Sequence, residues 1–202
     1  MSTEGNNGAL AGLRKLLQDD RSIRRFDGEL VLPYSVMESL VELTRWCASG
    51  RNLQPLRYRI VSDRDEAAAI YPYLKWAGYL PEWDGPAEGE RPNNYLVQCI
   101  DTDLTENCMC DDGLHLQTIT LGARALGMGC CIIKSFDPAK VSETLGIPER
   151  YRPLYVIAIG KGVEQVEVVD TNGTTDADIR YYRHEDGTHV VPKRPLKEMI
   201  ID

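Results

Sequence analysis

The segment RSIRRF, residues 21–26, places three arginines and one hydroxyl group directly after an expected helix. That helix is predicted over Ala9–Gln18, where leucines recur at helical spacing. Planar guanidinium groups that stand close together can hold a phosphate through paired hydrogen bonds. Solvated arginines on an acidic protein would give the same cluster, so the segment alone indicates an anion site without deciding it.

A second segment, CASGRNLQP at 47–55, follows another expected helix. Pro33 lies at the first turn of that helix, which is predicted to continue to Leu43. Small side chains in the 47–55 loop leave room for backbone N–H groups and the Asn52 amide to approach a planar ring. An ordinary turn between a helix and a strand is the alternative interpretation.

Hydrophobic patterning along the remaining chain predicts a single α+β domain over residues 1–202. Residues 75–93 mix prolines and glycines with aromatic side chains, which favours an irregular excursion and a candidate lid. Residues 163–202 are polar and rich in turns, and they form a candidate C-terminal arm that wraps over a partner subunit. The predicted strands are 56–62, 95–101, 130–133 and 154–159, and the predicted helices are 64–71, 111–126 and 138–145.

The composition excludes several classes of protein. The formal net charge is −8 and the isoelectric point is about 5.0, so no general basic field is present for a nucleic-acid backbone. No segment approaches the roughly 18 uninterrupted apolar residues that a membrane span needs, and the N-terminus lacks a signal-peptide pattern. The six cysteines do not resemble a secreted disulfide framework, so reduced thiols in a cytoplasmic protein are expected.

Other catalytic and metal-binding motifs have no anchor in this chain. The cysteine spacings at 108–110 and 130–131 match no usual zinc or iron–sulfur pattern, so no metal is expected. Gly127 and Gly129 lack the third glycine of a dinucleotide loop, because Ile132 stands there. The sequence contains neither G-x-S-x-G nor a P-loop. Structural or surface roles are expected for the three histidines, His115, His184 and His189.

Four segments, taken in order, resemble signatures of the nitroreductase family. They are RSIRRF and CASGRNLQP, then DDGLHLQTITLGARALGMGCCIIKSFD at 111–137, and finally HVVPKRPL at 189–196. The corresponding family signatures are a basic R-S-x-R-x-F element, a P-S-x-x-N-x-Q-P-W loop, a long central helix with a Gly-rich turn, and a basic C-terminal phosphate contact. Three residues depart from the family pattern: Ala48 replaces Pro, Arg51 replaces a small residue and Leu56 replaces Trp.

The resemblance implies a nitroreductase-like α+β fold, with a mixed sheet flanked by helices. It further implies a homodimer, with the central helix from Asp111 to Leu126 at the two-fold interface and a C-terminal extension onto the partner. Noncovalent FMN would occupy two equivalent pockets at that interface.

The same resemblance implies a set of residues that bind the cofactor. Arg21, Ser22 and Arg24 would contact the FMN phosphate, ribityl chain and pyrimidine edge. The other predicted cofactor-binding residues are Ser49, Gly50 and Asn52 from the second subunit, the backbone of Ile133, Lys134 and Ser135, and the basic pair Lys193 and Arg194.

The implied activity is that of an FMN-dependent NAD(P)H oxidoreductase. NADH or NADPH would give a hydride to flavin N5, and a nitroaromatic, quinone or similar electron-poor acceptor would then take it in a ping-pong reaction. No catalytic acid or base is required, because the flavin carries the chemistry and Arg24 stabilises negative charge on its reduced form. A flavin store or sensor without useful NAD(P)H turnover is the alternative, which Arg51 and Leu56 make plausible.

The acceptor would bind near four residues, Arg51, Trp76, Tyr79 and Trp83. The three aromatic side chains have two interpretations: the local core of the 75–93 excursion, or a wall of the acceptor pocket. Arg51 in the same pocket would favour acceptors that are anionic or become anionic on reduction.

Overall fold

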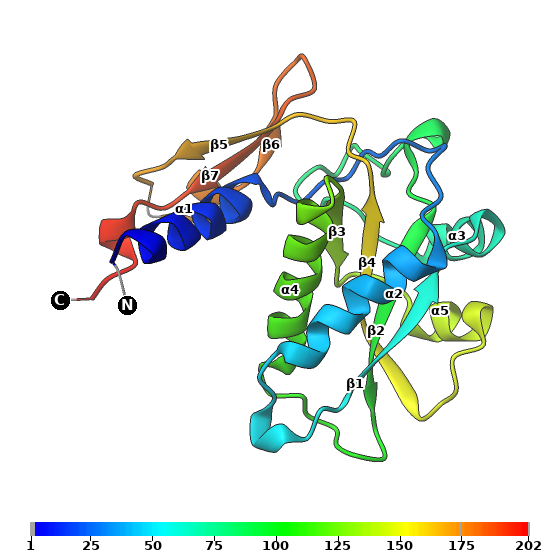
Figure 1. Cartoon of the computed structure of the whole chain (residues 1–202). Coiled ribbons are helices and arrows are strands. Elements are labelled where there is room, and N and C mark those ends of the chain that lie inside the picture. Colours follow the sequence, from blue (N-terminus) through cyan, green and yellow to red (C-terminus); the bar gives the residue numbers. More distant parts are fainter. Residues whose placement is uncertain (1–2, 174, 202) are drawn as a thin grey trace.

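The computed structural model describes residues 3–173 and 175–201, and its main body is built on a four-stranded antiparallel sheet (Figure 1). The strands lie in the spatial order β1-β2-β4-β3, so β2 and β4 each have a neighbour on both sides. Their bounds are β1 Leu56–Val61, β2 Asn94–Asp101, β3 Gly129–Ile133 and β4 Tyr151–Gly160.

The central strand β2 has no exposed residue, because helices cover both faces of the sheet. Tyr95, Val97 and Cys99 pack into one cluster of buried residues, and Leu96 packs into the other. Successive residues of a strand point to opposite faces, so an almost continuous apolar run is the pattern that a doubly covered strand requires.

Two helices lie on each face of the sheet (Figure 1). Helices α2 (Tyr34–Leu43) and α4 (Asp111–Ala125) cover one face, and α3 (Arg64–Ile70) and α5 (Pro138–Leu145) cover the other. The carboxylate of Asp63 caps the N-terminus of α3 by accepting from two backbone N–H groups at 3.0 Å. Short 3₁₀ turns occur at Thr44–Trp46, Gly50–Asn52, Tyr71–Tyr73, Glu88–Glu90 and Leu196–Glu198.

The N-terminal helix and the C-terminal arm lie together, outside the main body (Figure 1). Helix α1 (Thr3–Asp19) runs beside a small sheet of order β5-β7-β6, in which β5 and β7 are parallel. The elements of the arm are β5 Val166–Asp170, α6 Asp176–Ile179, β6 Tyr182–Arg183 and β7 His189–Lys193. No described helix combines the length and apolar character that a membrane crossing requires.

The RSIRRF segment crosses from α1 to the main sheet as an extended strand-like stretch. Ser22 forms a parallel bridge with Cys130 of β3, and Phe26 forms an antiparallel bridge with Gly162. Ile23 and Phe26 pack against the core, and Phe26 is fully buried. Ser22 is exposed and Arg24 is half-buried, so neither side chain is enclosed by that core.

Predicted elements and observed elements agree within a few residues over the main body. The C-terminal arm differs, since the sequence predicted only turns where three strands and a short helix are present. The arm's strands are short and mostly exposed, so hydrophobic periodicity is weak in them. Their order depends on pairing β5 with β7 across a long connection, which local patterning does not encode.

Candidate functional site

A cavity of about 370 Å³ lies where the RSIRRF segment, α4, β3 and the small sheet meet. Two of the predicted segments supply its basic side chains: Arg21 and Arg24 come from the first, and Lys193 comes from the end of β7. Ser22 lies in the same wall. The structure therefore brings together predicted residues from opposite ends of the chain.

Arg21 has a donor that the protein leaves unused. One terminal nitrogen of its guanidinium donates to the Leu17 carbonyl oxygen at 2.6 Å, whereas its Nε is buried and finds no acceptor among the described residues. A buried N–H without an acceptor costs about 1–3 kcal/mol. This donor therefore points to an acceptor that the described chain does not supply.

Asp20 brings a carboxylate into the same cavity. Its Oδ2 accepts from Thr120 Oγ1 at 2.7 Å and from Gln117 Nε2 at 2.9 Å, and both partners lie on α4. Arg21 and Lys193 also border the groove beside α1. The cavity is thus cationic on its α1 side and suited to hydroxyl groups on its α4 side, because a carboxylate accepts hydrogen bonds from hydroxyls.

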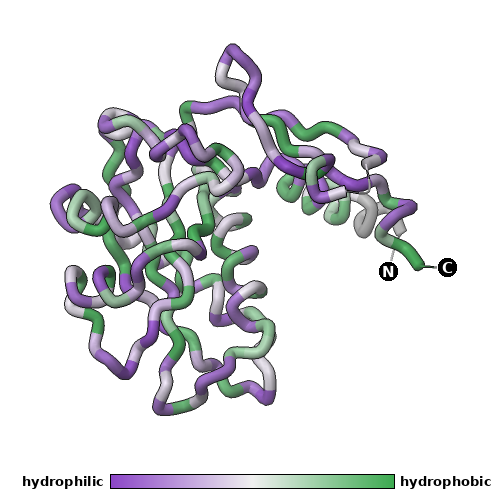
Figure 2. The backbone as a smooth tube through the Cα atoms, turned by 180° about the vertical axis from the view of Figure 1, so that it is seen from behind, coloured by the Kyte–Doolittle hydropathy of each residue, from purple (hydrophilic) through white to green (hydrophobic). Residues whose placement is uncertain are grey.

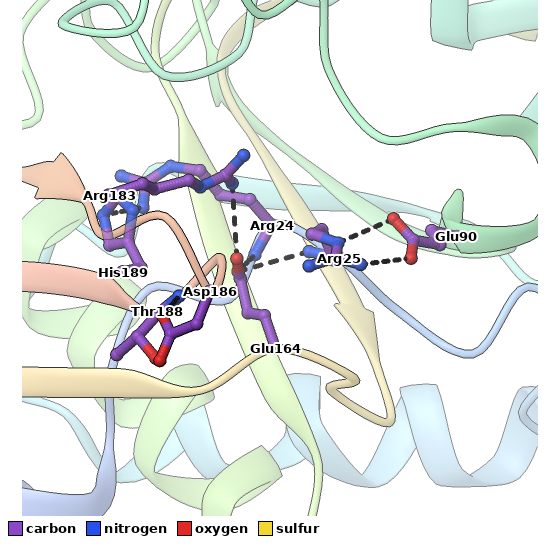
Figure 3. Close-up of polar contacts among 8 residues, drawn as sticks. All are labelled: Arg24, Arg25, Glu90, Glu164, Arg183, Asp186, Thr188 and His189. Atoms are coloured by element: carbon purple, nitrogen blue, oxygen red, sulfur yellow. Dashed lines mark hydrogen bonds and ion pairs between the residues drawn. The ribbon is translucent and has the colours of Figure 1, made fainter.

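Arg24 is held by a histidine from the C-terminal arm (Figure 3). Its guanidinium lies 3.0 Å from Nε2 of His189, and its Cζ lies 4.8 Å from the ring centroid of Tyr181. His189 and Tyr181 pack ring to ring at 5.0 Å. The arm therefore supplies two side chains that fix the position of Arg24.

A network of charges lies behind Arg24 (Figure 3). Glu164, whose side chain is fully buried, accepts from the backbone N–H groups of Arg24 and Arg25 and from Arg183 at 3.3 Å. Arg25 forms a two-point bond with Glu90 at 2.7 and 2.6 Å. Three arginines thus face two carboxylates, which leaves one positive charge on the cavity side.

His189 is neutral at physiological pH. A guanidinium can only donate, so Nε2 must accept and the ring proton must sit on Nδ1. Burial, followed by the charges of Arg24 and Arg183, lowers the pKa of His189 from 6.5 to about 4. Its Nδ1 is buried and has no partner within the described residues.

The depressed pKa predicts that acid weakens the fold through His189. Between pH 4 and pH 6.5 the unfolded histidine binds a proton that the folded one refuses, so stability falls as the pH drops through this range. The full difference corresponds to about 3 kcal/mol. Urea unfolding at pH 6.5 and pH 4.5 should show a smaller loss for His189→Gln than for wild type, and equal losses would contradict the assignment.

The second predicted group of cofactor residues lies at the N-terminus of α4. Ser49 Oγ donates to Asp111 Oδ2 at 2.6 Å, and the Gly50 N–H donates to Asp111 Oδ1 at 3.0 Å. Asp111 is almost fully buried. From the sequence, Asp111 was expected only as the first residue of the central helix, so its anchoring role was missed.

The loop anchored by Asp111 has an unusual backbone. Arg51, Asn52 and Gln54 all have positive φ angles, 53°, 56° and 50°. Non-glycine residues in this region are strained by about 1–3 kcal/mol each, and such strain persists where the surroundings enforce it. A cavity of about 460 Å³ opens beside Ser49, between α2, β1 and α4.

One chain does not bring its two groups of predicted residues together. The first cavity meets α4 at Gln117 and Thr120, whereas Ser49 is bound to Asp111 at the start of that helix. At 1.5 Å per residue, these points are roughly 9–14 Å apart along the helix axis. That Ser49, Gly50 and Asn52 complete a site on another subunit stays a prediction.

The remaining predicted cofactor residues lie outside the first cavity. Alternation along β3 gives Cys130 and Ile132 to the cavity wall and directs Ile133 into the core. Lys134 bonds to the Leu154 carbonyl oxygen at 3.3 Å.

Two further predicted residues are engaged elsewhere in the chain. The Ser135 carbonyl oxygen accepts from the backbone N–H of Lys75 at 2.9 Å. Arg194 pairs with Glu198 at 3.2 Å, so only Lys193 of the basic C-terminal pair borders the cavity. The FMN-binding roles of all the predicted residues, inside and outside the cavity, stay predictions.

The aromatic side chains of the 75–93 excursion were expected either in its local core or in the wall of an acceptor pocket, and they differ in their surroundings. Trp76 belongs to the buried core, and Trp83 packs against that core with Arg183 at 4.1 Å from its ring centroid. Only Tyr79 is exposed and reaches towards the cavity, because its ring packs on Tyr181 at 5.0 Å. Arg51 lies on the strained loop and is not among the described residues that line the cavity beside Tyr181 or the one within the excursion.

Within the described residues, no cluster of three or more His, Cys, Asp or Glu side chains could hold a metal ion. Burial raises the pKa of the Cys99 thiol to about 12 and that of the Cys131 thiol to about 11. Such thiols are poor nucleophiles, so their places in the structure are those of packed core residues.

The fold and the cavity together define a class: an α+β protein with a cavity lined by two arginines, a lysine and the carboxylate of Asp20. The nitroreductase family model matches residues 18–84 and 106–161, more than half of the chain. The chain therefore belongs to the nitroreductase family.

Individual relatives agree with this membership. An oxygen-insensitive NADPH nitroreductase from Helicobacter pylori is 24% identical over 205 residues, covering 81% of this chain and 94% of the relative. A nitroreductase family protein from Streptococcus pneumoniae superposes with a TM-score of 0.67 at 19% identity, covering 94% and 99% of the two chains. An FMN-dependent nitroreductase from Clostridium difficile gives a TM-score of 0.62 at 18% identity, covering 81% and 92%.

Proposed function

We propose that the chain is an FMN-dependent NAD(P)H oxidoreductase that reduces nitroaromatic, quinone or similar electron-poor acceptors. The observation that carries the proposal is the pair of buried, unpaired donors in the cavity wall, Arg21 Nε and His189 Nδ1. They stand beside the cations of Arg24 and Lys193. Family membership and relatives described as NADPH or FMN-dependent nitroreductases support the same reading.

The residues present fit FMN. Arg21 and Lys193 would hold the phosphate, because both are cationic and border the cavity on its α1 side. Asp20, Ser22 and Thr120 would take the ribityl hydroxyls. Arg24 would meet the pyrimidine edge of the ring with the positive charge that the network behind it leaves unbalanced.

The protein contributes binding and electrostatics to the reaction. When bound, FMN supplies the two-electron chemistry between NAD(P)H and the acceptor. The charge of Arg24 lies in a half-buried site, where it stabilises negative charge better than it would in water. Arg24 needs no proton transfer for this role, in agreement with the absence of a predicted acid–base group.

We further propose a homodimer in the cytoplasm, in which residues 163–202 of each single-domain chain act as an arm and residues 75–93 act as a lid. Apolar side chains support this, since Leu10 and Leu13 of α1 are 57% and 48% exposed. Met199, Ile200 and Ile201 are also exposed, and Figure 2 shows hydrophobic chain close to the C-terminus. A second subunit would cover these surfaces and bring Ser49, Gly50 and Asn52 to the cavity.

Light scattering of the flavin-loaded protein should therefore give twice the chain mass of 22.7 kDa. The expected mass should persist on dilution, because a symmetric interface completes both cofactor sites at once. A stable monomer that carries a full complement of FMN would contradict the dimer.

Anaerobic mixing with NADH or NADPH tests the activity itself. An oxidoreductase should bleach the flavin absorbance rapidly with at least one nucleotide, and adding a quinone or nitroaromatic compound should restore it. A flavin store or sensor, the alternative that exposed Arg51 and buried Leu56 leave open, would keep its yellow colour over the same period.

A further inference from the structure

The arginines around the cavity differ in their partners. Arg25 is paired with the carboxylate of Glu90, and Arg183 is paired with that of Glu164. The side chain of Arg24 instead meets the neutral ring of His189, and no ion pair to it occurs among the described residues. Arg21 and Arg24 are thus the two cavity arginines without an ion pair among the described residues, and Arg24 is the one held by a neutral side chain.

We infer that His189 is a positioning residue, which holds the Arg24 guanidinium against the flavin site through a neutral acceptor and so preserves its positive charge. The inference rests on the proposed function, because the charge acts on reduced FMN. It assigns His189 no contact with the reacting atoms. Its effect is transmitted through Arg24 alone.

The geometry leaves His189 little freedom. Its backbone N–H donates to the Gln165 carbonyl oxygen at 2.9 Å, which fixes the start of β7 opposite β5. Its ring is fully buried and packs on Tyr181. With Nε2 held 3.0 Å from Arg24, the imidazole determines where the guanidinium lies.

A neutral acceptor leaves the positive charge of Arg24 uncompensated. A carboxylate beside Arg24 would cancel its charge, as Glu90 does for Arg25. Reduced FMN carries more negative charge than oxidised FMN, so it gains more from an uncompensated cation. His189 should therefore raise the affinity for reduced FMN relative to oxidised FMN.

The test compares His189→Gln, His189→Leu and His189→Glu in the FMN-loaded protein. The amide oxygen of Gln is a neutral acceptor, Leu has none, and Glu adds a charge at the same length as Gln. His184→Glu is the matched control, because His184 is exposed between β6 and β7. The readouts are the dissociation constants of oxidised and reduced FMN and the two-electron midpoint potential.

Gln should keep the ratio of the two dissociation constants near the wild-type value. Glu should weaken reduced FMN at least tenfold relative to oxidised FMN, which lowers the midpoint potential by about 30 mV. The His184→Glu control should shift the potential much less. If the Glu variant does not fold, the comparison of His189→Gln with His189→Leu decides. Equal ratios of the two dissociation constants in these variants would show that the His189 ring only packs, and would overturn the inference.

The tautomer gives an independent check on the protein without FMN. Nitrogen-15 chemical shifts should place the proton of His189 on Nδ1, and a proton on Nε2 would overturn the inference. If all three variants bind FMN with the same ratio of oxidised to reduced dissociation constants, the inference is overturned but the proposed function is not. A wild-type chain that binds FMN in neither redox state would overturn it together with the proposed function.

Discussion

Replacing Arg24 by Ala is expected to weaken FMN binding about 10- to 150-fold, and the wild-type protein is expected to purify yellow with noncovalent FMN. The change removes a charge-assisted donor from a half-buried wall, which typically costs about 1.5–3 kcal/mol. His189 would then keep a buried Nε2 without its donor. Titration of the flavin-free protein with FMN, followed by fluorescence quenching, measures the effect.

Two further variants make this result specific to Arg24. Arg64→Ala removes an exposed arginine that pairs with Glu29 at 3.0 Å, away from the cavity, and should leave FMN affinity unchanged. Arg24→Lys keeps the charge but loses the planar fork, so it should recover part of the affinity. A colourless wild-type protein that cannot be loaded with FMN would refute the cofactor assignment.

The main body was predictable from the sequence because its elements follow strong local rules. The run from Tyr95 to Asp101 is apolar enough for a strand covered on both faces, and Gly127 and Gly129 do mark the end of α4. The basic cluster that lines the first cavity was predictable because Arg21 and Arg24 lie close together in the sequence. In the folded segment Ile23 and Phe26 pack on the core, whereas Ser22 and Arg24 border the cavity.

The supports of the site could not be predicted, because they depend on contacts between distant parts of the chain. Glu164 and His189 lie in the polar arm, where nothing local distinguishes them from solvated residues, yet both hold the Arg24 region. An acidic residue at a helix N-terminus is favourable by itself, so the position of Asp111 along the chain gave no reason to expect its bonds to Ser49 and Gly50. Each of these contacts forms only when distant segments pair in a sheet or pack against a helix. Amino-acid composition does not predict such contacts.

The alternation of side chains along β3 explains why Ile132 and Ile133 have different surroundings. Neighbouring residues of a strand face opposite sides, so a displacement by one position exchanges cavity and core. Ile132 is 41% exposed and borders the cavity, whereas Ile133 is 3% exposed and lies in the core. The resemblance assigned only the backbone of Ile133 to the flavin, so the direction of its side chain leaves that assignment a prediction.

The excursion at 75–93 is expected to control acceptor choice through Tyr79, while Trp83 supports the flavin site itself. Tyr79 reaches the cavity only through Tyr181, on which its ring packs and to whose hydroxyl oxygen its backbone N–H donates at 3.1 Å. Trp83 instead packs beneath Arg183, which pairs with Glu164 behind Arg24. The two aromatic residues therefore act on different parts of the same site.

Tyr79→Ala should change the relative rates at which nitroaromatics and quinones reoxidise the flavin by about two- to tenfold, the loss of 0.5–1.5 kcal/mol typical of one aromatic pair. Flavin reduction by the preferred nicotinamide should stay close to wild type. Trp83→Ala should slow both half-reactions, because it loosens Arg183 and with it the backbone of Arg24. Stopped-flow absorbance of the FMN-loaded variants separates the half-reactions, and a Tyr79→Ala protein that slows reduction as much as every reoxidation would show that the excursion shapes the whole flavin environment.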